Sequence, residues 1–292
     1  MFVLNVIGKG AQPGLFEGLG AGAATVLSEN HAFDLPVEEK LARALLAEAR
    51  ALGLTLGLAL DINLVAIANR RKKLLVADMD STVITGECLD ELADMAGLKA
   101  KIAPITAKTM RGEMDFEASL RERVRMLKGL PLSALEKVWA ERIKLDPGAK
   151  RLVATMRAHG ARSLLVSGGF HFFTRRVARA AGFDEEHGNH LMDDGVRLTG
   201  EIGPPFQDPF GKWEILKTAV TRLRLNFSDA LAVGDGANDL MMIMRAGEFG
   251  GLGVAYHAKP VVAEAAGAII AHNDLTALLY LQGYHESEVV SR

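Results

Sequence analysis

Residues 73–82 read Lys-Leu-Leu-Val-Ala-Asp-Met-Asp-Ser-Thr, a short apolar run that ends in two acids, and this stretch decides the fold. The same pattern of an apolar run with a polar end returns at residues 162–167 and 229–235. Weaker apolar runs follow at 252–255 and 268–271. Continuous runs of this length are typical of strands that are covered on both faces. We therefore expect these runs to form the buried strands of one sheet.

Helical patterns separate the apolar runs, at residues 150–158, 174–181, 213–223, 240–246 and 261–266. An alternation of strand and helix predicts an α/β fold, a doubly wound parallel sheet with helices on both faces. Ligands of such sheets bind beyond the carboxyl ends of the strands. The polar residues of the three strong runs all fall at that end, so we expect the functional site there.

A long insertion separates the first two strong runs, because residues 79–161 far exceed what a simple crossover needs. Helical patterns at 87–96, 102–110, 116–127 and 132–140 predict a helical cap at about residues 84–145, placed over the strand ends. A second irregularity lies at residues 189–202, where Asp194-Gly195 is a strong signal for a hairpin turn.

Residues 1–70 differ from the rest and predict a small, separate α+β domain, which leaves residues 71–292 for the main domain. We expect a strand at 2–7, an amphipathic helix at 37–51 and further strands at 54–60 and 63–68. This region holds no recognisable chemical motif, and its function stays open.

The composition excludes several classes of protein. The chain has 292 residues, 49% of them hydrophobic, and a formal net charge of −2, so it lacks the electrostatic footprint of a nucleic-acid-binding protein. A single cysteine, Cys88, allows no intrachain disulfide. We find no signal-peptide pattern and no apolar run that approaches the ~20 residues of a membrane helix. A cytoplasmic protein that binds neither nucleic acid nor membrane is the expectation.

Asp78 and Asp80 place two carboxylates at the end of one strand, and Asp235 follows another strand. Like charges this close raise a pKa unless a cation lies between them, and oxygen ligands of this kind suit Mg²⁺. The simpler alternative is an acidic turn in which Asp80 caps the next helix. For the segment 235–239, Asp-Gly-Ala-Asn-Asp, the alternative is a turn with Asp239 as the N-cap of a helix.

Ser167-Gly168-Gly169 follows the second strong run and precedes a helix, which is the arrangement of a phosphate cradle. Alone it is weak, because turns of this composition are common. Lys212 lies near the start of a helix, where a positive charge is unfavourable for the helix dipole. A phosphate oxygen explains that position, although an exposed lysine in the first turn does so equally well.

The four segments together resemble the haloacid dehalogenase superfamily, with its Asp-x-Asp-x-Thr, Ser-Gly-Gly, Lys and Gly-Asp-Gly-x-Asn-Asp motifs in this order. The resemblance covers roughly residues 73–284. Within the superfamily, the block at 78–82, Glu87 and residues 119–124 (Ser-Leu-Arg-Glu-Arg-Val) resemble the phosphoserine phosphatase family. Some relatives carry an ACT-type domain at the N-terminus, but residues 1–70 are short for one and show no clear βαββαβ pattern.

The resemblance implies a Mg²⁺-dependent hydrolysis of O-phosphoserine in serine biosynthesis. It is also compatible with assembly as a homodimer. It makes Asp78 the nucleophile and Asp80 the general acid and base. Metal ligands would be Asp78, Asp235 and the backbone carbonyl of Asp80. The remaining implied roles fall to residues that hold phosphate or substrate or support them: Ser167, Gly168, Gly169, Lys212, Asn238 and Asp239 at the strand ends, and Glu87, Met110, Phe116 and Arg123 in the cap.

Two alternatives keep some of these residues and change the function. One is a phosphatase or phosphotransferase of the same superfamily that acts on another small amino-alcohol phosphate. The other is a receiver-like domain that keeps its aspartyl phosphate and catalyses nothing. Asp80 and the long insertion argue against the receiver, because a second acid beside the nucleophile promotes turnover.

Overall fold

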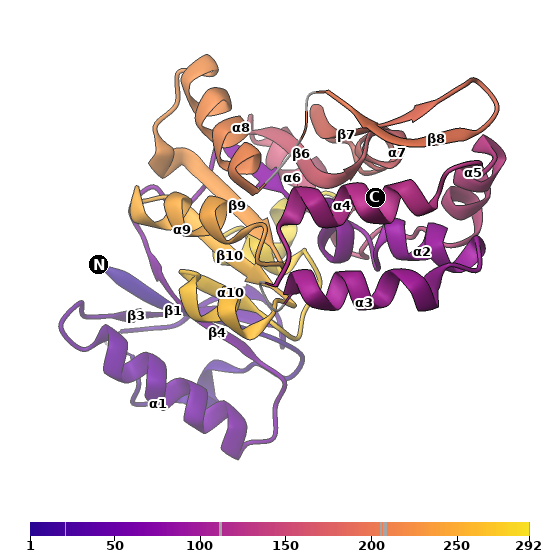
Figure 1. Cartoon of the computed structure of the whole chain (residues 1–292). Helices are drawn as coiled ribbons and strands as arrows, with labels where there is room; N and C mark the ends of the chain where they lie inside the picture. Colours follow the sequence, from indigo (N-terminus) through magenta and orange to yellow (C-terminus); the bar gives the residue numbers. More distant parts are fainter. Residues whose placement is uncertain (21, 111–112, 205, 207–208, 292) are drawn as a thin grey trace.

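A sheet of seven strands, in the order β11-β10-β9-β5-β6-β7-β8, forms the centre of the computed structural model (Figure 1). The structure describes the chain except residues 21, 111–112, 205, 207–208 and 292, together with the side chains of 110, 209 and 210. Neighbouring strands are parallel, except that β8 returns antiparallel to β7. The strands are β5 (Leu74–Ala77), β6 (Arg162–Phe170), β7 (Glu185–Asp193), β8 (Leu198–Gly203), β9 (Ala230–Gly234), β10 (Leu252–Tyr256) and β11 (Ala268–Ile270). The predicted parallel sheet is confirmed, and so is the hairpin around Asp194-Gly195.

Helices cover both faces of this sheet, as a doubly wound fold requires. Side chains alternate along β5, so that Leu74 and Val76 pack with α8 (Pro209–Arg222) and α9 (Leu240–Glu248). Leu75 and Ala77 point the other way and pack in the core that includes α6, α7 and α11. The bounds of these helices are Ala149–Ala158, His171–Ala181 and Ala277–Leu281, while α10 (Pro260–Ala265) packs beside α9.

The predicted cap is a group of four helices inserted between β5 and α6, seen together on the right of Figure 1. They lie between Ile84 and Leu145, which form an antiparallel bridge where the chain leaves and re-enters the core. Strand β8 supports the cap from the other side, because backbone bonds join Leu198 to Gly129 and Leu130 at 2.8 and 2.9 Å. The helices are α2 (Cys88–Met95), α3 (Lys99–Met110), α4 (Phe116–Met126) and α5 (Leu132–Glu141).

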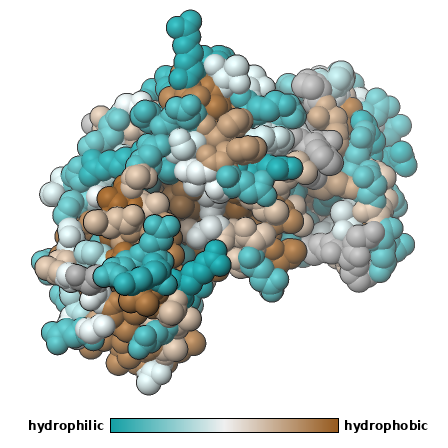
Figure 2. Space-filling model, turned by 90° about the vertical axis from the view of Figure 1, so that its left-hand side faces the viewer, coloured by the Kyte–Doolittle hydropathy of each residue, from teal (hydrophilic) through white to brown (hydrophobic). Residues whose placement is uncertain are grey.

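The N-terminal region forms a separate antiparallel sheet of order β2-β3-β1-β4, with one α-helix. On the face drawn in Figure 2, apolar atoms gather in the lower part, where Figure 1 places this sheet and its helix. The elements are β1 (Phe2–Ile7), β2 (Thr25–Ser28), β3 (Ala32–Val37), α1 (Ala42–Thr55) and β4 (Asp61–Ala66). A 3-10 turn, Pro13–Phe16, lies where a βαββαβ unit has its first helix, which is why that pattern was not visible in the sequence.

Two expectations for the N-terminal region are wrong. The helix expected at 37–51 begins at Ala42, because Val37 belongs to β3 and pairs with Phe2 across the sheet. No strand forms at the described residues 54–60, because the helix continues to Thr55 and Gly57 then turns the chain at φ +65°. The division of the chain into domains stays a prediction.

Side chains of β4 fasten the N-terminal sheet to the edge strand β11. The amide of Asn63 donates to the carbonyl of Ile269 and accepts from its N–H, at 2.9 and 2.8 Å. The carboxylate of Asp61 accepts from the N–H groups of Ala271, His272 and Asn273. This sheet is therefore held against the core by partly buried hydrogen bonds and not only by the connecting chain. Among the described helices, none combines the length and apolar character needed to cross a membrane.

Candidate active site

The carboxyl ends of β5, β6 and β9 bring the predicted site residues to one edge of the sheet. Ala77 pairs with Leu165 on β6 and with Val233 on β9, so the residues that follow these three positions leave the sheet side by side. The N–H of Asp78 donates to the carbonyl of Val233 at 3.0 Å, which fixes the first acid at the end of β5.

Lys212 lies between two carboxylates beneath the floor of the site. Its Nζ donates to Oδ1 of Asp78 and to Oδ1 of Asp239, each at 2.6 Å, and its side chain is 1% exposed. Although burial lowers the pKa of Lys212, Asp239 and Asp78 hold it above its usual value. Burial, and then the charge of Asp239, raise the pKa of Asp78 well above that of a free aspartate, against the opposing effect of Lys212. The unfavourable position of Lys212 at a helix start is thus offset by two buried charges.

Asp80 has a different environment from Asp78, although only one residue separates them. After Asp78 the chain makes a tight turn in which Ser81 has φ +57°. The turn lets Asp80 accept from the N–H of Cys88 at 2.8 Å and from the hydroxyl of Ser167 at 3.1 Å. Burial raises the pKa of Asp80, while these two donors oppose the rise. The Asp80 carboxyl group is therefore held in place and inclined to carry a proton.

Ser167, Gly168 and Gly169 lie within β6, which continues to Phe170, so the expected turn after the strand is wrong. The pairing of β6 with β7 shifts between Val166 and Phe170, and this irregular stretch carries the three residues. At these two positions only glycine leaves room for the neighbouring side chains. A Cβ on Gly169 would lie 2.7 Å from Oδ2 of Asp80, and one on Gly168 would lie 3.0 Å from the Phe116 ring. The backbone N–H of Gly169 donates to the Ser167 hydroxyl at 2.8 Å.

Carboxylate oxygens of Asp78, Asp235 and Asp239 lie within 4.8 Å of one another, a donor set that fits a metal ion. Asp239 has both oxygens engaged, with Lys212 on Oδ1 and the N–H of Gly236 on Oδ2 at 3.0 Å. Lys212 takes only Oδ1 of Asp78, so Asp78 and Asp235 are the carboxylates better placed to bind a cation. Burial, and then Asp239, raise the pKa of Asp235 to about 6, a sign of negative charge that a cation would relieve.

A cavity of about 230 Å³ opens above these groups, between the strand ends and the cap. Burial, and then Asp80, raise the pKa of Glu87 to about 7, and burial lowers that of Arg123. Lys212 and Asp239 lie below the lining, and the side chain of Met110 lies outside the described residues. The predicted residues that line the cavity are Asp78, Asp80, Glu87, Phe116, Arg123, Ser167, Gly168, Gly169, Asp235 and Asn238.

The sequence interpretation missed several residues that line the same cavity. Asp90, Thr106 and Thr109 face it from the cap, and Lys259 faces it from the core. None belongs to a motif, so only the fold brings them together. For Lys259 a signal did exist, because it lies just beyond the weak apolar run at 252–255, at the carboxyl edge of the sheet.

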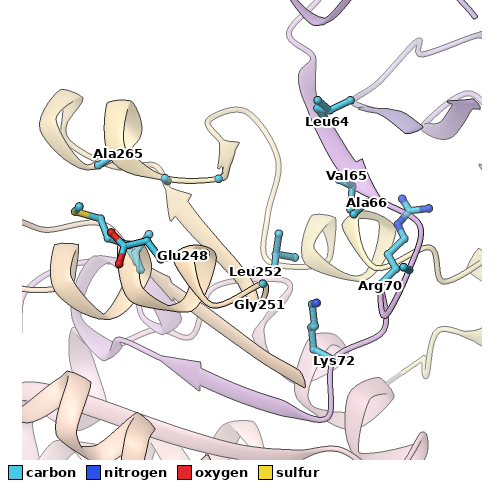
Figure 3. Close-up of a pocket in the computed structure, with 17 residues that line it drawn as sticks. Leu64, Val65, Ala66, Arg70, Lys72, Glu248, Gly251, Leu252 and Ala265 are labelled. Carbon is cyan, nitrogen blue, oxygen red and sulfur yellow. The ribbon is translucent and has the colours of Figure 1, made fainter. Parts of the chain in front are cut away.

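A second cavity, of about 340 Å³, lies at the amino end of β10 and is shown in Figure 3. Lys72 and Arg70 project toward it, but Lys72 donates to the carbonyls of Asn69 and Ser228, and Arg70 pairs with Asp34. The cavity contains none of the predicted site residues, so the chemistry belongs to the opposite edge of the sheet.

Residues 75–244 match the family model of the haloacid dehalogenase-like hydrolases. The chain belongs to that family. It is 41% identical over 223 residues to a phosphoserine phosphatase of Archaeoglobus fulgidus, an alignment that covers 76% of this chain and 63% of the relative. The chain therefore spans less than two thirds of the length of that relative.

Two solved structures, one of a probable and one of a named phosphoserine phosphatase, are similar to the chain. A probable phosphoserine phosphatase from Vibrio cholerae is 31% identical and superposes with a TM-score of 0.78 over 96% of this chain and 86% of that one. A phospho-aspartyl intermediate analogue of phosphoserine phosphatase is 36% identical, with a TM-score of 0.65 over 72% of this chain and 98% of that one. The first match includes the N-terminal sheet.

Proposed function

We propose that this protein hydrolyses O-phospho-L-serine to serine and inorganic phosphate, as the last step of serine biosynthesis, through a phosphorylated Asp78. One observation carries the proposal. Glu87 and Arg123, the two groups that complement an amino acid, line the same cavity as Asp78, Asp80 and Ser167. The relatives named phosphoserine phosphatase support the same substrate.

Asp78 is the proposed nucleophile because it leaves β5 at the floor of the cavity with Lys212 beside it. An oxygen of Asp78 attacks phosphorus, the bond from phosphorus to the serine oxygen breaks, and an aspartyl phosphate forms. The buried Lys212 offsets the charge of Asp78 and of the phosphoryl group, which would otherwise repel each other. The Ser167 hydroxyl and the N–H group of Gly168 hold the phosphoryl oxygens, Gly169 leaves room for Asp80, and Asn238 contacts the bound group from the cavity lining.

Asp80 is the proposed general acid and base, since its pKa is raised and it is held by Cys88 and Ser167. It gives its proton to the departing serine oxygen, and the resulting carboxylate takes a proton from the water that hydrolyses the aspartyl phosphate. A Mg²⁺ ion held by Asp78, Asp235 and the Asp80 carbonyl would supply further neutralisation of phosphate charge. Asp239 keeps Lys212 in place.

The cap is proposed to select the substrate. Glu87 pairs with the serine ammonium group, and Arg123 binds its carboxylate through paired hydrogen bonds. Arg123 is directed by its own helix, because its Nε donates to the Ser119 carbonyl one turn earlier at 3.3 Å. Phe116 closes the cavity over Gly168, and Met110 is proposed to do so as well.

The test is phosphate release from a panel of small phosphate esters with Mg²⁺ present. Phosphoserine should be among the best substrates, and Asp78→Asn should abolish turnover while the exposed control Asp194→Asn should not. Arg123→Ala should impair phosphoserine strongly but leave phosphoethanolamine, which lacks the carboxylate, nearly unaffected. A preference for the carboxylate-free ester in the unaltered protein would favour the other amino-alcohol phosphates instead. A homodimer stays a prediction, which light scattering checks.

A further inference from the structure

The open part of the active-site cavity carries an excess of negative charge. Its described lining residues include two cations, Arg123 and Lys259. Lys212 is buried below and shared between two carboxylates, so little of its charge reaches the entrance. A phosphate ester arrives as a dianion and must enter against this field. The lining carboxylates are Asp78, Asp80, Glu87, Asp90 and Asp235.

Lys259 is placed on the phosphate side of the cavity by the backbone. Strand β10 lies next to β9, whose carboxyl end leads into Asp235. The N–H of Lys259 donates to the carbonyl of Asp235 at 3.1 Å, so the two loops are joined at this point. Pro260 follows and begins α10, and it restricts Lys259 to the extended conformation seen, with φ −62° and ψ 150°. Arg123, by contrast, is held on the cap.

Helix stability does not explain a lysine at this position. Lys259 is the N-cap residue of α10 and makes no side-chain capping bond. A positive charge at the start of a helix is unfavourable, and serine, threonine or aspartate would cap it better. The side chain is exposed to solvent, and Lys259 lines the active-site cavity. Its charge is therefore placed to act on a ligand in the cavity and not on the helix.

We propose that Lys259 is a binding residue for the phosphoryl dianion at the entrance of the active site. It attracts the phosphoryl group of the incoming ester and retains inorganic phosphate before release. Lys212 does not act at the entrance, because its side chain is buried below the cavity and pairs with Asp78 and Asp239. The inference rests on the proposed phosphatase activity, but not on which ester is the substrate.

The first test measures the binding of inorganic phosphate by calorimetry, with Mg²⁺ present and at low salt. Lys259→Met, which keeps the length and removes the charge, should weaken phosphate binding about tenfold, or about 1.4 kcal/mol. Lys259→Arg should bind within about twofold of the unaltered protein. The matched control is Lys137→Met, an exposed lysine of α5 that is not among the lining residues.

The second test separates capture from chemistry. For the best ester of the panel, Lys259→Met should lower kcat/KM about tenfold and change kcat less than about twofold. The loss should shrink when salt is raised from about 0.05 M to about 0.5 M, because the charge is exposed and screened.

Three results would overturn the proposal: phosphate binding by Lys259→Met equal to that of the unaltered protein, Lys259→Arg as weak as Lys259→Met, or a loss that does not depend on salt. If phosphoserine proves a poor substrate, the proposed substrate fails. The phosphate titration then still decides the role of Lys259.

Discussion

Replacing Lys212 with methionine should reveal how much the site depends on one buried cation. Methionine keeps most of the length and volume of lysine but has no charge. In the native structure the side chains of Lys212, Asp78 and Asp239 are 1%, 4% and 0% exposed. The substitution therefore leaves two carboxylates buried side by side with no cation between them.

The size of the effect follows from this geometry. Removing one partner of a buried ion pair costs about 3–5 kcal/mol, because the remaining charge is desolvated and unpaired. Lys212 serves two carboxylates, so we expect a loss of about 5 kcal/mol in the free energy of unfolding near neutral pH. That is a large share of the total stability of a typical protein.

The loss should depend on pH in a defined direction. Burial already raises the pKa of Asp78, and removing Lys212 raises it further, since Lys212 is a cation that opposes the rise. A carboxyl group whose pKa is higher in the folded than in the unfolded chain binds more protons when folded. The penalty is therefore small at acidic pH and grows as the pH rises above the unfolded value of about 4.

Urea unfolding in the presence of EDTA, at about pH 5 and pH 8, measures both expectations. The control is Lys217→Met, on the same helix, because Lys217 makes an exposed pair with Glu214 and should contribute less than about 1 kcal/mol. An equal loss for the two variants, or a Lys212→Met loss that is the same at both pH values, would show that the ion triad is not the source of stability.

Three further predictions address the carboxylates. Burial, and then Asp80, raise the pKa of Glu87 to about 7. Because only the ionised form of Glu87 pairs with an ammonium group, kcat/KM for phosphoserine should increase as the pH rises through about 7. Glu87→Gln should flatten that increase. Asp80→Asn should slow turnover about 10²–10⁴-fold, because both the departure of serine and the attack of water lose the group that carries their proton, and the rate of phosphate release measures this. Asp61→Asn should lower the free energy of unfolding by about 2 kcal/mol or more, because Asp61 accepts several hydrogen bonds, among them one from Ala271 at 2.7 Å; an unchanged urea midpoint would contradict this.

The site at the strand ends was predictable because it depends on a local rule. An apolar run that ends in a polar residue places that residue at the carboxyl edge of a parallel sheet, whatever the rest of the chain does. The register of Ala77 with Leu165 and Val233 shows this rule at work. The predicted start of the helix at 37–51 was wrong for a non-local reason, since the pairing of Val37 with Phe2 depends on a strand far away in the sequence.

The errors at Gly168 and Gly169 and the omission of Lys259 share a cause. In the sequence, two glycines favour a turn, but here they make room for Asp80 and Phe116, which are distant in the chain. The role of Lys259 likewise depends on its position beside Asp235. The pairing of β10 with β9 brings these two residues together. Contacts of this kind leave no local pattern.

The turn between the two acids of residues 78–82 places their carboxyl groups in different surroundings. Asp78 stays at the strand end, where Lys212 lowers its pKa against the larger effect of burial. Ser81, with its positive φ, turns the chain so that Asp80 meets donors that carry no charge, the Cys88 N–H and the Ser167 hydroxyl. Burial raises the pKa of Asp80, and these donors oppose the rise. We propose that Asp78, beside Lys212 at the strand end, is the nucleophile, and that Asp80, held by Cys88 and Ser167, carries the proton.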